Sequence, residues 1–443
     1  MKEKIIELVA NKEFVQLKQL LAECNSADVS EVIDELPIED GALVLRLLDK
    51  DEAAEVFSRM EADTQESIIN VLKDGELKQL MDNLYADDMV DMISEMPAVM
   101  VKRILSNVNK EMRGYINELL KYPKDSAGSL MTIEFVDLRA GMSVQEAFDR
   151  IRKVGDDKET IYTCYVIDSA RHLLGVVTVK ELLLAPLDAK VDDLMETNLV
   201  KVNTLDDQEE VAAQFDKYDF LAMPVVDNEN RLVGIITIDD AIDVMSEETN
   251  EDFELMSAIT PSDDSYMKMS AWTHAKHRIV WLLVLMLSAT LTGGIITHYQ
   301  TVFAAIPILV SFIPMLMDTG GNCGSQTSTL IIRGLATGDL QLKDILKVWF
   351  KEINVALLVG LMLGVVNFAR ILILYHDPLL AIVVSLALMC TVILAKSLGC
   401  ILPMLAKRLH LDPALMASPL ITTIVDTVSI LIYFQIAVVL MGI

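Results

Sequence analysis

An aspartate interrupts the last strongly apolar stretch of this sequence. Asp426 lies about seven residues into the segment 419–441, which is long and apolar enough to cross a bilayer. A carboxylate at membrane depth costs roughly 3 kcal/mol on insertion scales, so such a group normally faces a bundle interior or a water-filled path. Thr422 and Thr423 add hydroxyl oxygens one turn earlier, and Ser429 is expected on the same helix face as Asp426. These oxygens would suit a hard cation.

The alternative for Asp426 is an internal salt bridge. We expect no second acidic residue in the other apolar segments, so Arg370 and Lys396 are the candidate partners. Arg370 is expected near the outer end of its segment and Lys396 within the next one, which makes Lys396 the stronger rival. We favour the ion site, because an acidic residue inside a membrane usually marks an ion path.

A second polar set occupies the glycine-rich stretch 314–329. Asp318, Asn322 and Gln326 offer oxygen ligands there, and the glycines would permit backbone turns that expose carbonyls. A hard cation, bare or hydrated, could be guided by such a set. The stretch is expected to break a helix at membrane depth, and the alternative is a re-entrant turn or a loop outside the membrane.

Five apolar segments are the elements that must position these residues. They are expected over 279–298, 303–317, 348–374, 379–402 and 419–441. Basic residues cluster before the first segment, between the second and third, and between the fourth and fifth. The positive-inside rule then predicts a multi-pass protein with its N-terminal domains in the cytoplasm and its C-terminus outside.

The rest of the chain is strongly acidic. Residues 1–276 carry 58 acidic and 28 basic residues, whereas residues 277–443 carry 7 and 9. Such an acidic half would repel nucleic acid and attract cations, although most surplus surface charge is only solvated. The five cysteines form no CxxC pair or zinc spacing, and no nucleotide-hydrolysis motif is present. The sequence therefore predicts no enzyme and no nucleic-acid partner.

The acidic half divides into three regions with different sequence patterns. Residues 1–122 repeat short amphipathic helices, which predicts a helical solenoid. Residues 123–246 contain two copies of a helix, strand, turn, strand, helix pattern about 60 residues apart, and each copy resembles a cystathionine-β-synthase-type (CBS) module. Residues 247–275 form an acidic connection, expected to be helical, and residues 276–443 form the membrane domain with five helices.

Acidic residues line one face of the connection and of the helix that precedes it. The residues that share this face at 3.6 residues per turn are Asp240, Asp243, Glu247, Glu248 and Glu251. Close carboxylates repel one another unless a cation lies between them, and Mg²⁺ bridges such clusters through few direct bonds. Two interpretations remain open at this point: a solvated linker helix, and a cation-responsive element next to a membrane pore.

Two membrane motifs resemble those of one known family. The run from Met317 to Ala336, MDTGGNCGSQTSTLIIRGLA, is similar to the signature of the MgtE family of magnesium transporters. The run from Asp412 to Thr427, DPALMASPLITTIVDT, is similar to the last-helix motif of that family. The order of helical N domain, CBS pair, acidic connecting helix and five spans also resembles the family over the whole chain.

The resemblance implies a homodimeric Mg²⁺ channel of the cell inner membrane with its pore between two membrane domains. It implies that Asp426 holds hydrated Mg²⁺ in the pore, and that cytoplasmic acidic residues bind Mg²⁺ to lock a plug helix over it. The acidic residues that match are Asp87, Asp91, Asp207, Glu209, Asp219, Asp240, Asp243, Glu248, Glu251 and Asp252. Family members can also bind ATP between the CBS modules, where this chain has Lys180 and Glu181.

Two other functions fit parts of the same pattern. A proton- or sodium-coupled divalent cation transporter could use a lone membrane carboxylate as a proton relay. A nucleotide-sensing membrane receptor would use the spans only to anchor the CBS pair. The sequence does not rank Mg²⁺ against other divalent cations, because selectivity depends on pore width and retained hydration.

Overall fold

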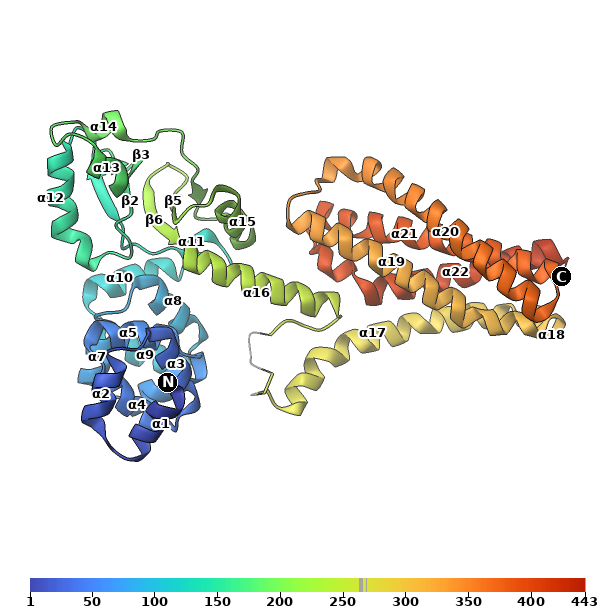
Figure 1. Cartoon of the computed structure of the whole chain (residues 1–443), viewed down its shortest axis with the longest axis horizontal. Coiled ribbons are helices and arrows are strands. Elements are labelled where there is room, and N and C mark those ends of the chain that lie inside the picture. Colours follow the sequence, from blue (N-terminus) through green and yellow to red (C-terminus); the bar gives the residue numbers. More distant parts are fainter. Residues whose placement is uncertain (263–265, 268, 443) are drawn as a thin grey trace. The chain divides into compact units, whose positions relative to one another are not determined.

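Two units make up the chain, Met1–Met245 and Ser246–Ile443 (Figure 1). The computed structural model describes residues 1–262, 266–267 and 269–442. The first unit holds the N-terminal helices and the paired CBS modules, and the second holds the membrane helices. We describe each unit by itself.

Short helices fill the first 120 residues. They are α1 (Lys2–Ala10), α2 (Phe14–Leu21), α3 (Ser26–Glu35), α4 (Ile38–Leu47), α5 (Lys50–Ser58), α6 (Ala62–Val71), α7 (Asp74–Met81), α8 (Ala86–Glu95), α9 (Ala98–Asn107) and α10 (Lys110–Leu119). Pro37 and Pro97 immediately precede α4 and α9, where a missing backbone N–H costs nothing. Helices two apart in the chain contact each other, such as α3 with α5 and α4 with α6. This stacking is that of a solenoid, as predicted for 1–122.

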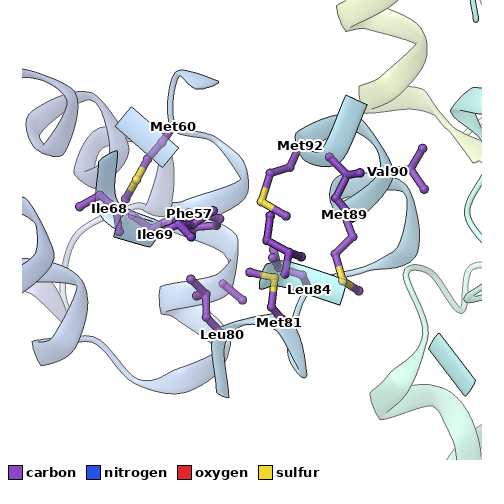
Figure 2. Close-up of a cluster of buried hydrophobic side chains, with 14 of the residues drawn as sticks. Phe57, Met60, Ile68, Ile69, Leu80, Met81, Leu84, Met89, Val90 and Met92 are labelled. Carbon is purple, nitrogen blue, oxygen red and sulfur yellow. The ribbon is translucent and has the colours of Figure 1, made fainter. Parts of the chain in front are cut away.

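Methionine supplies much of the core between these short helices. Figure 2 shows Met60, Met81, Met89 and Met92 in the same cluster as Phe57, and all five side chains are buried. An unbranched thioether fills irregular gaps that branched side chains would leave open. The core therefore holds α5 to α8 in place, and α8 carries Asp87.

Two sheets follow, each with three strands. The first module contains α11 (Ala127–Leu130), β1 (Val136–Arg139), α12 (Val144–Val154), β2 (Thr163–Ile167), β3 (Leu173–Thr178), α13 (Val179–Leu184) and α14 (Val191–Leu194). The second contains β4 (Val202–Asn203), α15 (Gln208–Tyr218), β5 (Ala222–Val226), β6 (Leu232–Thr237) and α16 (Ile238–Met256). In each sheet the first two strands are parallel and the last two are antiparallel. The predicted repeat of two CBS modules is confirmed.

Glycines at matching positions of β3 and β6 let backbone pass close to each sheet. A Cβ at Gly175 would lie 3.0 Å from the Glu196 carbonyl oxygen, and one at Gly234 would lie 2.7 Å from the Thr132 carbonyl oxygen. The residue after each glycine forms an isolated bridge beside its strand, from Val176 to Glu196 and from Ile235 to Thr132. The glycine in each copy of the repeat therefore has a packing role.

The acidic connection differs from the prediction. One helix, α16, runs without a break from the end of β6 to Met256, so it begins nine residues before the expected start at 247. The described residues from 257 to 270 are not helical, and residues 263–265 and 268 of the predicted connecting helix lie outside the described part. The helix ends where Ala258 adopts a positive φ of 55°. Within the second unit, Leu255 and Met256 pack against Ile332 and Ala414.

Long helices form the membrane domain. They are α17 (Ala271–His298), α18 (Gln300–Ala305), α19 (Ile313–Ala336), α20 (Ile345–Tyr375), α21 (Pro378–Arg408) and α22 (Ser418–Met441). Among the described residues, α17, α20, α21 and α22 are long and apolar enough to cross a bilayer. Helix α19 is 24 residues long, contacts α21 and α22, and is not one of these four, so the count of five spans stays a prediction.

The glycine-rich stretch does not break a helix, which corrects the prediction for 314–329. It lies wholly within α19, whose glycines serve close helix packing. A Cβ at Gly320 would come within 2.8 Å of Val425 Cγ1, and one at Gly324 within 2.6 Å of Ile421 Cγ2. Sequence patterns cannot separate the two roles, because glycine permits turns as well as close helix contacts.

Candidate ion-binding sites

Two acidic residues approach each other inside the membrane domain. Asp426 of α22 is partly buried, and Asp318 of α19 lies within electrostatic range of it. The two helices come close because glycines line the contact, with Gly321 of α19 against Thr422 of α22. Two like charges in a region of low dielectric repel each other unless a cation or a proton compensates them.

The polar residues of α19 form a ladder on one side. Asp318, Asn322 and Gln326 are spaced four residues apart and are all exposed on this chain, so they lie along one helix face. Residues on the opposite face of the helix, such as Gly324 and Thr327, are buried. A row of carboxylate and amide oxygens is a fitting surface for a hydrated cation.

The hydroxyls near Asp426 are only partly available to a cation or its hydration water. Thr422 and Thr423 both donate to the Pro419 carbonyl oxygen, each at 2.9 Å. Each hydroxyl oxygen can still accept a hydrogen bond from a cation's hydration water. Ser429 was expected on the face of Asp426, but it is fully buried. It faces α19, because a Cβ at Gly320 would lie 3.6 Å from its hydroxyl oxygen.

The two cationic residues considered as partners of Asp426 are engaged elsewhere. Lys396 of α21 lies 3.6 Å from the carboxylate of Glu352 on α20. Arg370 donates to the Asn367 amide oxygen at 2.9 Å. The expectation that no other span carries an acidic residue is therefore wrong. Glu352 follows Lys351 near the start of its apolar segment. It was overlooked as a membrane carboxylate because its neighbours in the sequence are partly polar.

A second group of acidic residues lies in the first unit, where α8 faces α16. The side chain of Asp87 is buried, and its pKa is raised well above the usual range by that burial and by the charge of Asp240. Burial also raises the pKa of Asp240 to about 7, although Thr237 donates a hydrogen bond of 2.7 Å to its carboxylate. Residues 153 positions apart in the sequence thus converge on one site.

Neighbouring carboxyls extend this cluster. Burial raises the pKa of Glu159 to about 8, with Asp88 and Asp239 adding repulsion. The pKa of Asp88 rises to about 6, mainly through burial, while the guanidinium of Arg59 opposes the rise. The sequence prediction missed Asp88, Asp239 and Glu159. Glu159 belongs to the loop before β2, and no helical or strand periodicity connects it to α8 or α16.

Two predicted residues lie at the edge of this cluster. Asp243 lies on α16, where desolvation of its carboxyl and the charge of Asp239 raise its pKa. Asp91 is exposed on α8, one turn after Asp87. Both are near enough in sequence to the buried pair to extend its negative surface.

The predicted residues of the second CBS module fall at the two ends of α15. Asp207 caps the start of the helix and accepts a 3.0 Å hydrogen bond from the backbone N–H of Glu209. Asp219 ends the helix in a left-handed conformation with φ of 55°. The helix between them spans about 16 Å, so Asp219 does not join the other two in one site within this chain.

A third group of acidic residues lies in the second unit. Burial raises the pKa of Asp252 to about 6, and Asp412, Glu248 and Glu251 add repulsion. Glu248 and Glu251 were predicted from the acidic face of the connection, and Asp252 from the family resemblance. Asp412 was missed, although it lies in the quoted motif before α22, where its side chain also accepts a bond from the Ala414 backbone N–H.

None of these groups, as far as the structure describes them, forms a complete metal coordination site. Among the described residues, no three His, Cys, Asp or Glu side chains converge in a way that could hold a metal ion. The carboxyls are near enough to repel one another, but they are not arranged as direct ligands.

Lys180 and Glu181 lie at the start of α13. Glu181 accepts hydrogen bonds from the backbone N–H of Thr178 at 2.7 Å and from its hydroxyl at 2.8 Å, which closes a capping box. Both residues are exposed. Glu181 therefore has a local structural role that explains its presence without a nucleotide, and ATP binding stays a prediction.

Family models match most of the chain, in the domain order that the sequence predicts. The model of the MgtE intracellular N domain matches residues 24–125, and CBS domain models match 127–188 and 191–247. The MgtE model, described as a divalent cation transporter, matches residues 313–436.

Curated relatives agree over nearly the whole length. The magnesium transporter MgtE of Thermus thermophilus is 38% identical, covering 95% of this chain and 94% of its own. The magnesium transporter MgtE of Bacillus subtilis is 31% identical, covering 98% and 96%.

Solved structures match the cytoplasmic part. The cytosolic domain of an Mg²⁺ channel MgtE in complex with ATP is 36% identical with a TM-score of 0.53, covering 55% of this chain and all of that one. The soluble part of a magnesium transporter is 30% identical with the same TM-score, covering 56% and 97%. From the order of its domains and its identity to full-length relatives, the chain belongs to the MgtE family.

Proposed function

We propose that this protein is a Mg²⁺-selective channel that admits magnesium and closes when cytosolic Mg²⁺ is plentiful. The observation that carries the proposal is the approach of Asp426 to Asp318 between membrane helices. The two candidate cationic partners, Lys396 and Arg370, are bonded to other groups. A mobile cation would therefore compensate the two carboxylates.

Passage of the ion needs no chemical energy source in this proposal. An inside-negative potential favours entry of a divalent ion by about 4.6 kcal/mol per 100 mV. Asp426 would hold the ion through its hydration water, and Thr422 and Thr423 would accept hydrogen bonds from that water. The ladder of Asp318, Asn322 and Gln326 would continue the path along α19.

A homodimer would complete the pore. The polar ladder of α19 is exposed on a single chain, and such groups are costly against lipid. A second copy packed on this face would remove the cost and enclose a polar path between the two membrane domains. We propose this assembly in the cell inner membrane, with the C-terminus outside.

Closure would use the acidic groups of the cytoplasmic region. Without metal, the carboxylates around Asp87 and Asp240 and around Asp252 and Asp412 repel one another. Mg²⁺ between them would favour the compact arrangement and shift the population toward a closed pore. Asp91, Asp207, Glu209, Asp219 and Asp243 would contribute further negative charge. ATP at Lys180 and Glu181 would be a second regulator, as the ATP complex of the related cytosolic domain suggests.

The test of the pore is Mg²⁺ uptake by Asp426→Ala in proteoliposomes and in a host that depends on added magnesium. We expect uptake to fall to the background of empty vesicles, with the variant still folded and inserted. Normal uptake would overturn the pore assignment and leave the receptor function. An imposed pH gradient separates a channel from a proton-coupled transporter, since only the latter would be driven by the gradient without a Mg²⁺ gradient.

A further inference from the structure

Three side chains from three membrane helices meet at one buried point. The Thr327 hydroxyl of α19 donates to the Glu352 carboxylate of α20 at 3.0 Å. The Lys396 ammonium of α21 donates to the same Thr327 oxygen at 3.1 Å and lies 3.6 Å from Glu352. Thr327 is completely buried, and the side chains of Lys396 and Glu352 are 8% and 15% exposed. We call these residues the Thr327 triad.

Burying the charges of the triad costs desolvation free energy, and hydrogen bonds within the triad offset part of that cost. A charge taken into a membrane domain loses its hydration, and an ion pair recovers this loss only when geometry and extra hydrogen bonds are good. Here Thr327 both donates and accepts, so its hydroxyl connects the two charges. The pair is neutral as a whole, and neither member is bonded to Asp426.

The backbone around the triad allows little movement. A Cβ at Gly399 of α21 would lie 2.4 Å from the Gly324 carbonyl oxygen of α19, so these two helices touch backbone to backbone one turn from Lys396. On its other side, α19 is bonded to the segment leading into α22. Ser325 pairs with Ser418 at 2.8 Å, and Ser328 donates to the Met416 carbonyl oxygen at 2.8 Å.

Thr327 lies directly after Gln326, the last member of the polar ladder. A rotation of α19 about its own axis would break the triad and, at the same time, move Asp318 relative to Asp426. We propose that Glu352 and Lys396, acting through Thr327, are positioning residues that fix the rotation of α19 and so set the spacing of the ion path. This inference rests on the proposed function as a cation channel.

Thr327→Val is the sharpest probe, because valine has nearly the shape of threonine and lacks the bridging hydroxyl. In proteoliposomes with the full-length protein, we expect the Mg²⁺ concentration for half-maximal uptake to rise about tenfold and the preference for Mg²⁺ over Ca²⁺ to fall. A purely structural role would reduce the amount of active protein, lowering the maximal rate at unchanged half-saturation and preference. Ser397→Ala is the matched control, since that hydroxyl only donates to Ile393 of its own helix.

Two double variants test the charges without leaving one of them unpaired. The exchange Glu352→Lys with Lys396→Glu keeps an ion pair around Thr327, and we expect it to restore half-saturation and ion preference to within about threefold of the parent. The neutral pair Glu352→Gln with Lys396→Met should fold, as judged by size-exclusion profile and thermal stability, yet behave like Thr327→Val. Half-saturation and ion preference can be measured in either double variant that folds.

The inference is overturned if Thr327→Val and the folded neutral pair both keep the parental half-saturation and Mg²⁺ preference. Asp426→Ala is measured in the same vesicles to separate this failure from that of the proposed function. Loss of uptake in Asp426→Ala with unchanged behaviour of the triad variants would remove only the positioning role. Normal uptake in Asp426→Ala would remove the channel itself.

Discussion

The buried carboxyl of Asp87 on α8 lies within electrostatic range of the half-buried carboxyl of Asp240 on α16, although nothing in the sequence between them predicts this proximity. Burial is the larger cause of both raised pKa values. The charge of Asp240 adds to the rise at Asp87, and the charges of Asp239 and Asp88 add to the rise at Asp240. A proton can therefore stabilise this contact, and so can a divalent cation. Protons and Mg²⁺ should compete for the same groups.

The first prediction concerns the pH dependence of this contact in metal-free protein. The pKa of Asp240 is about 7 in the folded arrangement, against about 4 for an exposed aspartate. A raised pKa means that the folded arrangement binds the proton more tightly. The stabilisation that this proton gives the folded contact is complete below about pH 4 and disappears as the pH rises through about 7. Hydrogen exchange of α8 and α16 in the full chain, corrected for intrinsic rates, should show more protection at about pH 5 than at about pH 8.

Added Mg²⁺ should remove most of that difference. It should protect α8 and α16 strongly at about pH 8 and little at about pH 5, because protonated carboxyls do not bind the ion. Protection that rises with pH in the absence of metal would contradict the raised pKa values.

The second prediction is that Asp240→Asn mimics the bound cation. Removing one buried negative charge should stabilise the metal-free contact at about pH 8 by on the order of 2 kcal/mol and reduce the further effect of Mg²⁺. The readout is the exchange of α8 and α16 with and without Mg²⁺. Asp63→Asn is the matched control, because Asp63 is an exposed aspartate on α6. Equal Mg²⁺ protection in Asp240→Asn and the parent would place the ion elsewhere.

The large elements of this protein could be read from its sequence, because periodicity reports them. Apolar residues at helical spacing gave the N-terminal solenoid, and the repeated strand pattern gave both CBS modules. Asp426 was also identifiable as a candidate site residue, because a carboxylate in an apolar segment differs from its neighbours. In each case the signal is local in the chain.

The sequence did not predict the features that depend on packing between distant segments. Glu352 and Lys396 come from different helices, and only their convergence on Thr327 gives them a shared role. Glu159 joins the acidic group of Asp240 from a loop. The glycines of α19 were expected to break the helix, because their contacts with α21 and α22 cannot be seen in one segment. Long-range contacts of this kind leave no periodic signature.

The third prediction concerns closure at the acidic group of Asp252. Asp412→Asn removes one of the charges that raise the pKa of Asp252, so Mg²⁺ has less repulsion to relieve there. We expect the Mg²⁺ concentration that half-inhibits uptake from the cytoplasmic side to rise several-fold, while uptake at low Mg²⁺ stays near the parental rate. Asp339→Asn, at an exposed aspartate in the loop after α19, is the control. Unchanged inhibition in Asp412→Asn would exclude this group from closure.

The fourth prediction concerns the contact between α19 and α21. Alanine at position 399 would place its Cβ 2.4 Å from the Gly324 carbonyl oxygen, and backbone on both helices would have to move. We expect Gly399→Ala to destabilise the membrane domain by about 1–3 kcal/mol, the usual range for overpacking. Gly293→Ala on α17 is the matched control, because a Cβ there meets no atom within 4 Å. That change should be neutral or slightly stabilising, since alanine favours the helix by about 1 kcal/mol. Thermal unfolding in detergent measures both, and equal melting temperatures would show that α19 and α21 do not touch at this glycine.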